Sequence, residues 1–206
     1  MKKCIIIGAG DFFGMIPDIN EGDFVIAADA GYINCLAAGI SPDLAVGDWD
    51  SAPAPTGVER IDLPVEKDDT DTLAAIRIGL EKGFDEFHIF GGTGGRIDHT
   101  FANMQCLVFL SKRGKRGFLH DENAVITAIT DGRIELLPLE SGDVSVFSVD
   151  GTAEGVSVIG LKYRADDIAL TADFPLGVSN SFVGRPAVIE VKRGTLLAVL
   201  PCAAIK

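Results

Sequence analysis

Carboxylates are concentrated in two short stretches of a chain that is otherwise rich in apolar residues. The first is Gly-Asp-Trp-Asp-Ser at 47–51, in which Asp48 and Asp50 flank the lone tryptophan. Both carboxylates could approach one cation if the backbone turns between them, and carboxylate oxygens are the usual protein ligands of Mg²⁺. An exposed Asx turn is the commoner origin of an isolated Asp-x-Asp, so this pair alone leaves both interpretations open.

The second acidic stretch, Glu-Lys-Asp-Asp-Thr-Asp at 66–71, opens a predicted helix at 70–82. A threonine or aspartate N-cap with acids in the first turn stabilises a helix, so one or two of these residues need no functional explanation. Three aspartates together with Lys67 exceed what a cap requires. The surplus indicates a site at the start of this helix.

The strongest single signal is Gly-Gly-Thr-Gly-Gly-Arg-Ile-Asp-His at 91–99, which follows an apolar strand and enters a predicted helix. Four glycines allow backbone N–H groups to approach phosphate oxygens closely, and Arg96 adds a planar charged donor. The Gly-Lys-Ser/Thr ending of a Walker loop is absent. A flexible strand-to-helix turn would explain the glycines, but it leaves Arg96, Asp98 and His99 unexplained.

A weaker alternative lies near the N-terminus. Gly8-Ala9-Gly10-Asp11-Phe12-Phe13-Gly14 is similar to a dinucleotide fingerprint, and Asp29 stands roughly where the acid that binds ribose would be. The spacing of the third glycine is one residue too long. This pattern is therefore kept only as a second interpretation.

The elements that must position these residues follow from hydrophobic patterning. Short apolar runs alternate with helix-like stretches in the first half of the chain: 4–7, 24–28 and 87–90 against 32–38, 70–82 and 99–111. This alternation predicts a parallel sheet covered on both faces. Ligands of such sheets bind outside the carboxyl ends of the strands, and the aspartates and the glycine loop all follow strands.

The rhythm changes near residue 120. Short alternating or β-branched runs follow, separated by the turn signals Asp131-Gly132, Asp150-Gly151 and Arg193-Gly194. No helix of ordinary length is legible there. The sequence predicts an α/β domain with a mostly parallel sheet at 1–121, followed by an all-β, sandwich-like domain at 122–206.

Composition excludes several classes of protein. The net charge of −12 over 206 residues argues against a nucleic-acid partner, because phosphate contacts need clustered Lys and Arg. The one dense basic run, at 112–116, is interpreted as a solvated helix end that complements the helix dipole. No apolar stretch reaches the roughly 20 residues that span a bilayer, so no membrane partner is expected.

The cysteines predict a reducing compartment. Cys4, Cys35, Cys106 and Cys202 are far apart, show no Cys-x-x-Cys spacing and mostly stand among apolar neighbours. We interpret them as reduced core residues of a cytoplasmic protein.

Taken in order, the motifs are far more specific than each one alone. Ala-Asp-Ala-Gly at 28–31, Ser-Pro-Asp-Leu-Ala-Val-Gly-Asp-Trp-Asp-Ser at 41–51, the acidic run at 66–71 and the glycine loop at 91–99 resemble the thiamine pyrophosphokinase (thiamine diphosphokinase) family. Gly-Leu-Lys-Tyr at 160–163 and Gly-Val-Ser-Asn-Ser at 177–181 extend the resemblance over nearly the whole chain.

The resemblance implies transfer of a pyrophosphoryl group from ATP to the hydroxyl of thiamine, with release of AMP. It implies Mg²⁺ dependence and a homodimer whose active site lies between the α/β domain of one subunit and the β domain of the other. The first domain would bind nucleotide and Mg²⁺, and the second would bind thiamine and form the dimer.

Roles are carried over by motif in four groups. The metal ligands implied are Asp48, Asp50 and Asp71. The nucleotide would contact Asp29, Lys67, Thr70, Gly94, Arg96 and His99. Thiamine would contact Asp48, Ser179 and Asn180. The catalytic group would be Asp71, Asp98 and Arg96, with Asp71 or Asp98 accepting the proton of the hydroxyl.

Two departures from the family pattern matter. Trp49 stands where the family commonly has phenylalanine, and the β half contains no tryptophan to stack on thiamine. Phe182, Phe174 and Tyr163 are possible aromatic partners, and each is equally well explained as a core residue.

Two rival functions remain open at this point. One is a nucleotide-sugar enzyme that uses Asp48 and Asp50 to hold a metal and a diphosphate, which gives no role to residues 96–99. The other is a non-catalytic nucleotide- or thiamine-binding module.

Overall fold

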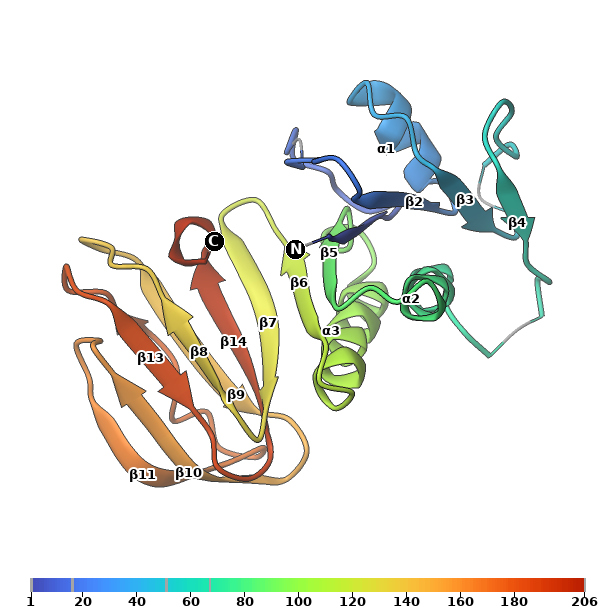
Figure 1. Ribbon diagram of the computed structural model, residues 1–206. Helices are drawn as coiled ribbons and strands as arrows, with labels where there is room; N and C mark the ends of the chain where they lie inside the picture. The colour runs from blue at the N-terminus through green and yellow to red at the C-terminus, as the bar shows by residue number, and fades with distance from the viewer. Residues whose placement is uncertain (1, 16, 51, 67, 206) are drawn as a thin grey trace. The chain divides into compact units, whose positions relative to one another are not determined.

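The computed structural model describes residues 2–15, 17–50, 52–66 and 68–205. It divides into two compact units, Met1–Cys106 with Lys115–Glu122, and Leu107–Gly114 with Asn123–Lys206. The last residues of helix α3 (Ile97–Ser111), from Leu107 onward, therefore belong to the second unit. The ribbon is shown in Figure 1.

The first unit is built on parallel strands. Within the described residues its strands follow one another in the order β6-β5-β1-β2-β3-β4. Their bounds are β1 Cys4–Ile7, β2 Phe24–Ala28, β3 Leu44–Gly47, β4 Arg60–Asp62, β5 Glu86–Phe90 and β6 Arg116–His120. Every neighbouring pair in this order is parallel. The innermost strands are apolar throughout because both faces of such a sheet are covered.

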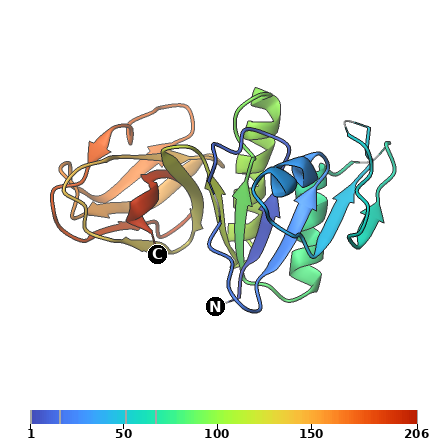
Figure 2. The ribbon, with the colours of Figure 1, turned by 90° about the horizontal axis from the view of Figure 1, so that it is seen from above.

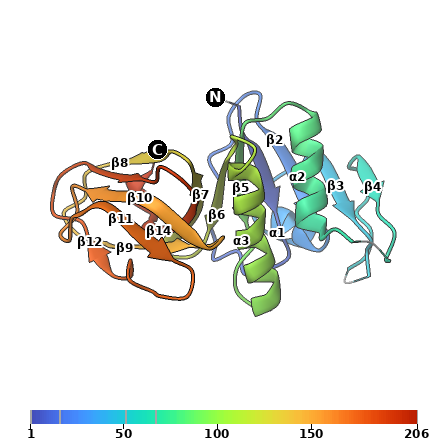
Figure 3. The ribbon, with the colours of Figure 1, turned by 90° about the horizontal axis from the view of Figure 1, so that it is seen from below.

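Helices cover the two faces of this sheet. They are α1 Gly31–Ala37, α2 Asp71–Glu81 and α3 Ile97–Ser111. The two opposite views in Figures 2 and 3 show α1 on one face and α2 with α3 on the other. Helix α2 begins as the sequence predicts, because the hydroxyl of Thr70 accepts a hydrogen bond from the Leu73 N–H at 3.2 Å.

The basic run at 112–116 is only half explained by a helix end. Helix α3 ends at Ser111, and the Arg113 guanidinium donates to the Phe109 carbonyl oxygen at 3.0 Å. Lys115 and Arg116 instead form ion pairs with Asp85 and Glu86. The expectation is therefore wrong for the second half of the run, because Arg116 begins strand β6.

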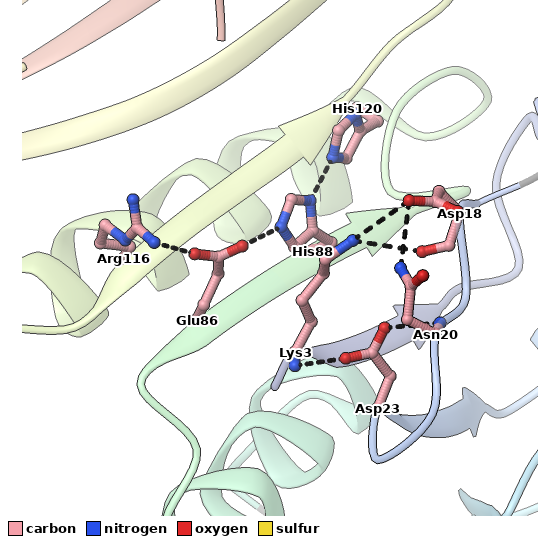
Figure 4. A network of polar contacts seen from close by, with 8 residues as sticks. All are labelled: Lys3, Asp18, Asn20, Asp23, Glu86, His88, Arg116 and His120. Carbon is pink, nitrogen blue, oxygen red and sulfur yellow. Dashed lines mark hydrogen bonds and ion pairs between the residues drawn. The ribbon is translucent and has the colours of Figure 1, made fainter. Parts of the chain in front are cut away.

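A partly buried polar network connects β5 and β6 (Figure 4). His88 Nε2 lies 2.9 Å from a Glu86 oxygen, and His88 Nδ1 lies 2.8 Å from His120 Nε2. Because a carboxylate only accepts, His88 donates from Nε2 and accepts at Nδ1 from the N–H of His120. Burial lowers the pKa of His88, and it lowers the pKa of His120 to about 3. Both rings are therefore neutral near pH 7.

The buried cysteines are unpaired, as the sequence predicts. Cys4, Cys35 and Cys106 lie in the interior as free thiols. Cys202 follows the last strand and is exposed, so the expectation of a core position is wrong for this residue. Burial raises the pKa of the Cys4 and Cys35 thiols to about 12. These groups act as small apolar side chains. No helix in the described part of the chain is both long and apolar enough to cross a membrane.

The second unit contains two antiparallel sheets. Their orders are β12-β9-β14-β7 and β11-β10-β13-β8. The bounds are β7 Ala124–Thr130, β8 Arg133–Leu136, β9 Asp143–Ser148, β10 Thr152–Ile159, β11 Ala165–Thr171, β12 Asn180–Ser181, β13 Ala187–Glu190 and β14 Thr195–Pro201, followed by the short 3₁₀ helix Cys202–Ala204.

The three turn signals in this unit carry the chain from one sheet to the other. Each links strands that do not pair, because β7, β9 and β14 lie in one sheet and β8, β10 and β13 in the other. The turns also hold one another: the Gly194 N–H donates to the Asp131 carboxylate at 2.8 Å, and the Thr195 N–H donates to Asp150 at 3.1 Å. Aspartate thus both starts a turn and fastens it to a neighbour.

Candidate functional site

A cavity of about 390 Å³ lies at the carboxyl ends of the central strands of the first unit. Three of its walls follow neighbouring strands: Gly8 follows β1, Asp29 follows β2 and Gly91 follows β5. The remaining lining includes Gly10, Thr70, Asp71, residues 92–96, His99 and Asn103. This is the place where a sheet of this kind binds ligands.

Two glycine loops form the floor of the cavity and are joined through their backbones. The Gly8 N–H donates to the Phe90 carbonyl at 2.8 Å, Gly10 to Gly91 at 2.7 Å and Asp11 to Thr93 at 3.0 Å. A Cβ at Gly8 or Gly10 would lie only 2.7 or 2.5 Å from a carbonyl oxygen of the facing loop. The loops approach this closely because both positions are glycine.

Side chains that the sequence did not single out hold these loops. Asn34 donates from Nδ2 to the carbonyls of Gly8 and Gly10 at 2.8 and 3.1 Å. Asn103 donates to the Gly92 carbonyl at 2.8 Å. One signal could have indicated Asn103, because it stands four residues after His99 and so shares its helix face.

The acidic group at the strand ends consists of Asp29, Asp48 and Asp50. Each offers an oxygen, and the three oxygens lie within 4.8 Å of one another. The backbone turns between Asp48 and Asp50 because Trp49 adopts the left-handed conformation, with φ of 59°. The backbone of Asp29 is also left-handed, with φ of 49°. Such conformations are costly for residues other than glycine and concentrate at functional sites.

The Asx interpretation and the metal interpretation coexist at this turn. The Asp50 N–H donates to the Asp48 carboxylate at 3.3 Å, which closes an Asx turn. The donor set is entirely carboxylate oxygen, which suits hard cations such as Mg²⁺. The residues present therefore fit the cation that the sequence predicts.

The other predicted residues of this region occupy three different positions. Asp71 begins α2 and lines the glycine cavity together with Asp29, outside the group of three close oxygens. Asp69 forms an ion pair with Arg77 at 2.7 Å. Lys67 lies outside the described residues. Asp29, predicted as a nucleotide contact, thus belongs both to the cavity and to the acidic group.

Arg96 and Asp98 face each other at the start of α3. The guanidinium donates to both carboxylate oxygens, at 2.6 and 3.2 Å, and both side chains are exposed. The hydrogen bond from Arg96 lowers the pKa of Asp98. A carboxylate with a lowered pKa is a weaker proton acceptor, so of the two candidates for that role Asp98 is disfavoured.

The glycines before this helix are also left-handed. Gly94 and Gly95 have φ of 74° and 57°, and both line the cavity together with His99. Backbone N–H groups at a helix start of this type are suited to anions.

The N-terminal glycines do not form a dinucleotide site. Gly8 and Gly10 line the cavity, but no helix begins between residues 8 and 23 among the described residues. A dinucleotide fingerprint requires a helix N-terminus directly after its glycines, so the alternative interpretation is wrong.

In the second unit, the predicted thiamine-binding residues Ser179 and Asn180 form hydrogen bonds with other residues of the same unit. The Asn180 amide oxygen accepts from the Tyr163 N–H at 2.9 Å, and its amide nitrogen donates to the Tyr163 carbonyl at 2.6 Å. The Ser179 N–H donates to the Ser145 hydroxyl at 3.1 Å. Asn180 therefore holds the backbone of Tyr163.

Beside Asn180 lies a second cavity of about 350 Å³, bounded mostly by valine, leucine and isoleucine of β9, β10, β11 and the loops around residues 161 and 176–178. Tyr163 lies at its edge and is 60% exposed, whereas Phe182 is buried. Phe174 is 63% exposed. Burial removes Phe182 from the three possible aromatic partners and leaves Tyr163 and Phe174.

The fold and the first cavity define a class of protein. A glycine-lined cavity at the carboxyl ends of parallel strands, with helix starts and carboxylates around it, is the kind of place where α/β proteins bind nucleotides and phosphates. Two family models cover most of the chain: "Thiamin pyrophosphokinase, catalytic domain" matches residues 18–119, and "Thiamin pyrophosphokinase, vitamin B1 binding domain" matches residues 134–196.

Individual relatives agree with these models. The thiamine pyrophosphokinase of Bacillus subtilis is 30% identical, with 96% of this chain and 98% of the relative covered. A crystal structure of the Bacillus subtilis protein has a TM-score of 0.87 at 28% identity, covering 97% and 99% of the two chains. The Candida albicans structure, at 15% identity, covers 97% of this chain and 89% of its own and shares the fold with a TM-score of 0.78. The chain belongs to the thiamine pyrophosphokinase family.

Proposed function

We propose that this chain transfers the pyrophosphoryl group of ATP to the hydroxyl of thiamine, giving thiamine diphosphate and AMP. Family membership over nearly the full length supports this activity. The observation that carries the proposal is the group formed by Asp29, Asp48 and Asp50 beside the glycine-lined cavity. Polyphosphate transfer is mostly positioning and neutralisation of charge, and this site offers both.

Mg²⁺ would be held by Asp29, Asp48 and Asp50, with ATP as the co-substrate. The sequence pattern implied Asp48, Asp50 and Asp71; the geometry supports Asp29 as the third oxygen donor. When bound, the cation neutralises the polyphosphate, which is how a chain with a net charge of −12 can accept a polyanion.

The nucleotide would lie along the glycine loops. The left-handed backbone at Gly94 and the start of α3 offer N–H donors to phosphate oxygens, and Arg96 and His99 border the same cavity. Thr70 contributes by capping α2 and so fixing Asp71. Lys67 keeps the nucleotide role that its motif implies.

In the transfer itself, the thiamine hydroxyl oxygen forms a bond to the β-phosphorus. The bond from that phosphorus to the oxygen bridging the α- and β-phosphates breaks, and AMP leaves with this oxygen. The proton of the hydroxyl passes to a carboxylate. We assign this role to Asp71, because its rival Asp98 is held by Arg96 and has a lowered pKa.

Thiamine would lie against the second unit near Ser179 and Asn180. We propose a homodimer in the cytoplasm, in which the second unit of the partner subunit completes the site. The buried free thiols of Cys4, Cys35 and Cys106 are consistent with a reducing compartment. Asn180 would act on thiamine indirectly, by shaping the Tyr163 backbone.

Phosphorus NMR tests the proposal. The protein is incubated with ATP, Mg²⁺ and thiamine, and the products are identified. AMP with thiamine diphosphate is expected. ADP with thiamine monophosphate would contradict it and indicate a different kinase. Binding of both substrates without turnover would favour the non-catalytic module. Asp48→Asn, which keeps the shape of the side chain but removes its charge, is the matched inactive control.

A further inference from the structure

We propose that Trp49 and Asp62 hold the backbone turn at 48–50, so that the carboxylates of Asp48 and Asp50 face one cation. Trp49 and Asp62 are then positioning residues. The inference rests on the proposed function only in that the cation is the Mg²⁺ of the transfer reaction. We call their contact the Trp49–Asp62 contact.

The register of two strands places the acceptor. Strands β3 and β4 pair in parallel with Gly47 opposite Asp62, and the Leu63 N–H donates to the Gly47 carbonyl at 2.9 Å. Asp62 is thereby fixed beside Gly47, the last residue of β3, which precedes Trp49 by two positions. The indole Nε1–H of Trp49 donates to Asp62 Oδ1 at 2.7 Å.

The rest of the indole is held by packing. Trp49 lies against the buried apolar cluster that includes Cys35 and Phe90. A Cβ at Gly47 would lie 3.3 Å from Trp49 Cζ3 and 3.0 Å from Asp29 Cα, so the ring, Gly47 and the Asp29 backbone are closely packed. The ring is thus fixed both at its face and at its N–H edge.

This double anchoring explains the conformation of the turn. A bulky residue with φ of 59° persists only where its surroundings determine it. A phenylalanine could fill the same space but has no N–H to donate to Asp62. Arg60 holds the acceptor from the other side, because its Nε lies 3.1 Å from the same Asp62 oxygen. The contact therefore depends on the indole N–H of Trp49.

Manganese binding tests the inference without substrates. Mn²⁺ alone is titrated into each protein, and free Mn²⁺ is measured by electron paramagnetic resonance. Trp49→Phe and Asp62→Ala should each raise the dissociation constant about tenfold, as loss of an outer-shell partner does. Asp62→Asn should raise it less than threefold, because its amide oxygen still accepts from the indole. Asp85→Ala, which removes an exposed acid from the ion pair with Lys115, should leave it unchanged.

The double variant Trp49→Phe/Asp62→Ala separates a shared role from two independent ones. If the two residues act through one contact, the double variant binds Mn²⁺ with the same affinity as the single variant that binds it less tightly. Each variant should also need more Mg²⁺ for half-maximal turnover, with kcat at saturating Mg²⁺ within about twofold of wild type. Circular dichroism spectra that match wild type exclude loss of fold.

Three results would overturn the inference. The first is an equal loss of Mn²⁺ affinity in Asp62→Asn and Asp62→Ala, which would assign the effect to charge. The second is an additive loss of affinity in the double variant. The third is the absence of Mn²⁺ binding by the wild-type protein at millimolar concentrations. Failure of the proposed function is a separate outcome, because the ranking of the Mn²⁺ affinities is measured without ATP or thiamine and stands even if no AMP is formed.

Discussion

The cavities of the two units differ in what lines them. In the first unit, the glycine backbone and carboxylates form the wall, and the loops are fixed by the amides of Asn34 and Asn103. In the second unit, the wall is mostly aliphatic, and the one amide beside it, Asn180, is used on the backbone of Tyr163. Residue types therefore indicate the chemistry of the first cavity, whereas the second offers a ligand mainly an apolar surface of a given shape.

The largest effect is expected at the acidic group beside the first cavity. Asp48→Asn removes one oxygen charge from the acidic group, and a bound metal is worth several kcal/mol to the transition state. We expect kcat to fall by about 10²–10³-fold. Steady-state formation of AMP measures this. Asp85→Asn removes an exposed acid outside both cavities and should retain activity; equal losses in the two variants would mean that overall charge matters rather than the site.

The second prediction concerns the first unit and how its free energy of unfolding changes in acid. Burial lowers the pKa of His120 to about 3, so between that value and about 6.5 the unfolded state binds more protons than the folded state. The contribution of the neutral His120 ring to the free energy of unfolding is therefore fully present above about pH 6.5 and is lost as the pH falls below that value. The loss between pH 7 and pH 5 should be roughly 2 kcal/mol for this group.

The measurement is urea unfolding followed by the fluorescence of Trp49, the one tryptophan in the chain, which lies in the first unit. His120→Gln can still donate to His88 and should lose about 2 kcal/mol less than wild type over this range. His99→Gln replaces an exposed imidazole and serves as the control. Parallel pH profiles for wild type and His120→Gln would contradict the assignment.

The third prediction concerns the second unit. Asn180→Ala leaves the N–H and carbonyl of Tyr163 without this partner, which should cost about 1–2 kcal/mol of stability and raise the KM for thiamine. Ser179→Ala removes only a hydroxyl and should leave the stability unchanged. Thermal unfolding with thiamine kinetics checks both. If Asn180→Ala is as stable as wild type, its amide is available to contact the substrate directly.

The smallest effect distinguishes two neighbouring glycines of the first cavity. A Cβ at Gly94 would lie 2.2 Å from Asp11 Oδ2, whereas a Cβ at Gly95 has no atom within 4 Å. Both have positive φ, so both substitutions strain the backbone and only Gly94→Ala displaces a neighbour. We expect the KM for ATP to rise about tenfold in Gly94→Ala and about threefold in Gly95→Ala. Equal rises would mean that strain alone matters.

The sequence predicts the regular parts of the first unit well. The strands at 4–7 and 24–28 and the helix capped by Thr70 are confirmed because apolar runs, periodicity and capping are local signals. Strand β4 was missed because its three residues are all exposed and carry no apolar pattern. Strand β11 was missed because Asp166 and Asp167 interrupt its alternation, with φ of 56° at Asp167.

The site was predictable in its residue types but not in its geometry. Spacing indicated that Asp48 and Asp50 belong together, yet only the structure shows that the backbone turns at Trp49 and that an oxygen of Asp29 lies within 4.8 Å of theirs. Asn34 was missed because its role depends on a loop 24 to 26 residues away. Lys67 lies outside the described residues, so its role stays a prediction.

The most direct test compares Asp29→Asn with Asp71→Asn while Mg²⁺ is varied and AMP is followed by phosphorus NMR. If Asp29 belongs to the metal group and Asp71 accepts the proton, Asp29→Asn raises the Mg²⁺ concentration for half-maximal turnover. Asp71→Asn lowers kcat at every Mg²⁺ concentration and leaves that midpoint unchanged. A shifted midpoint in Asp71→Asn with an unshifted one in Asp29→Asn would contradict the assignment of the two carboxylates.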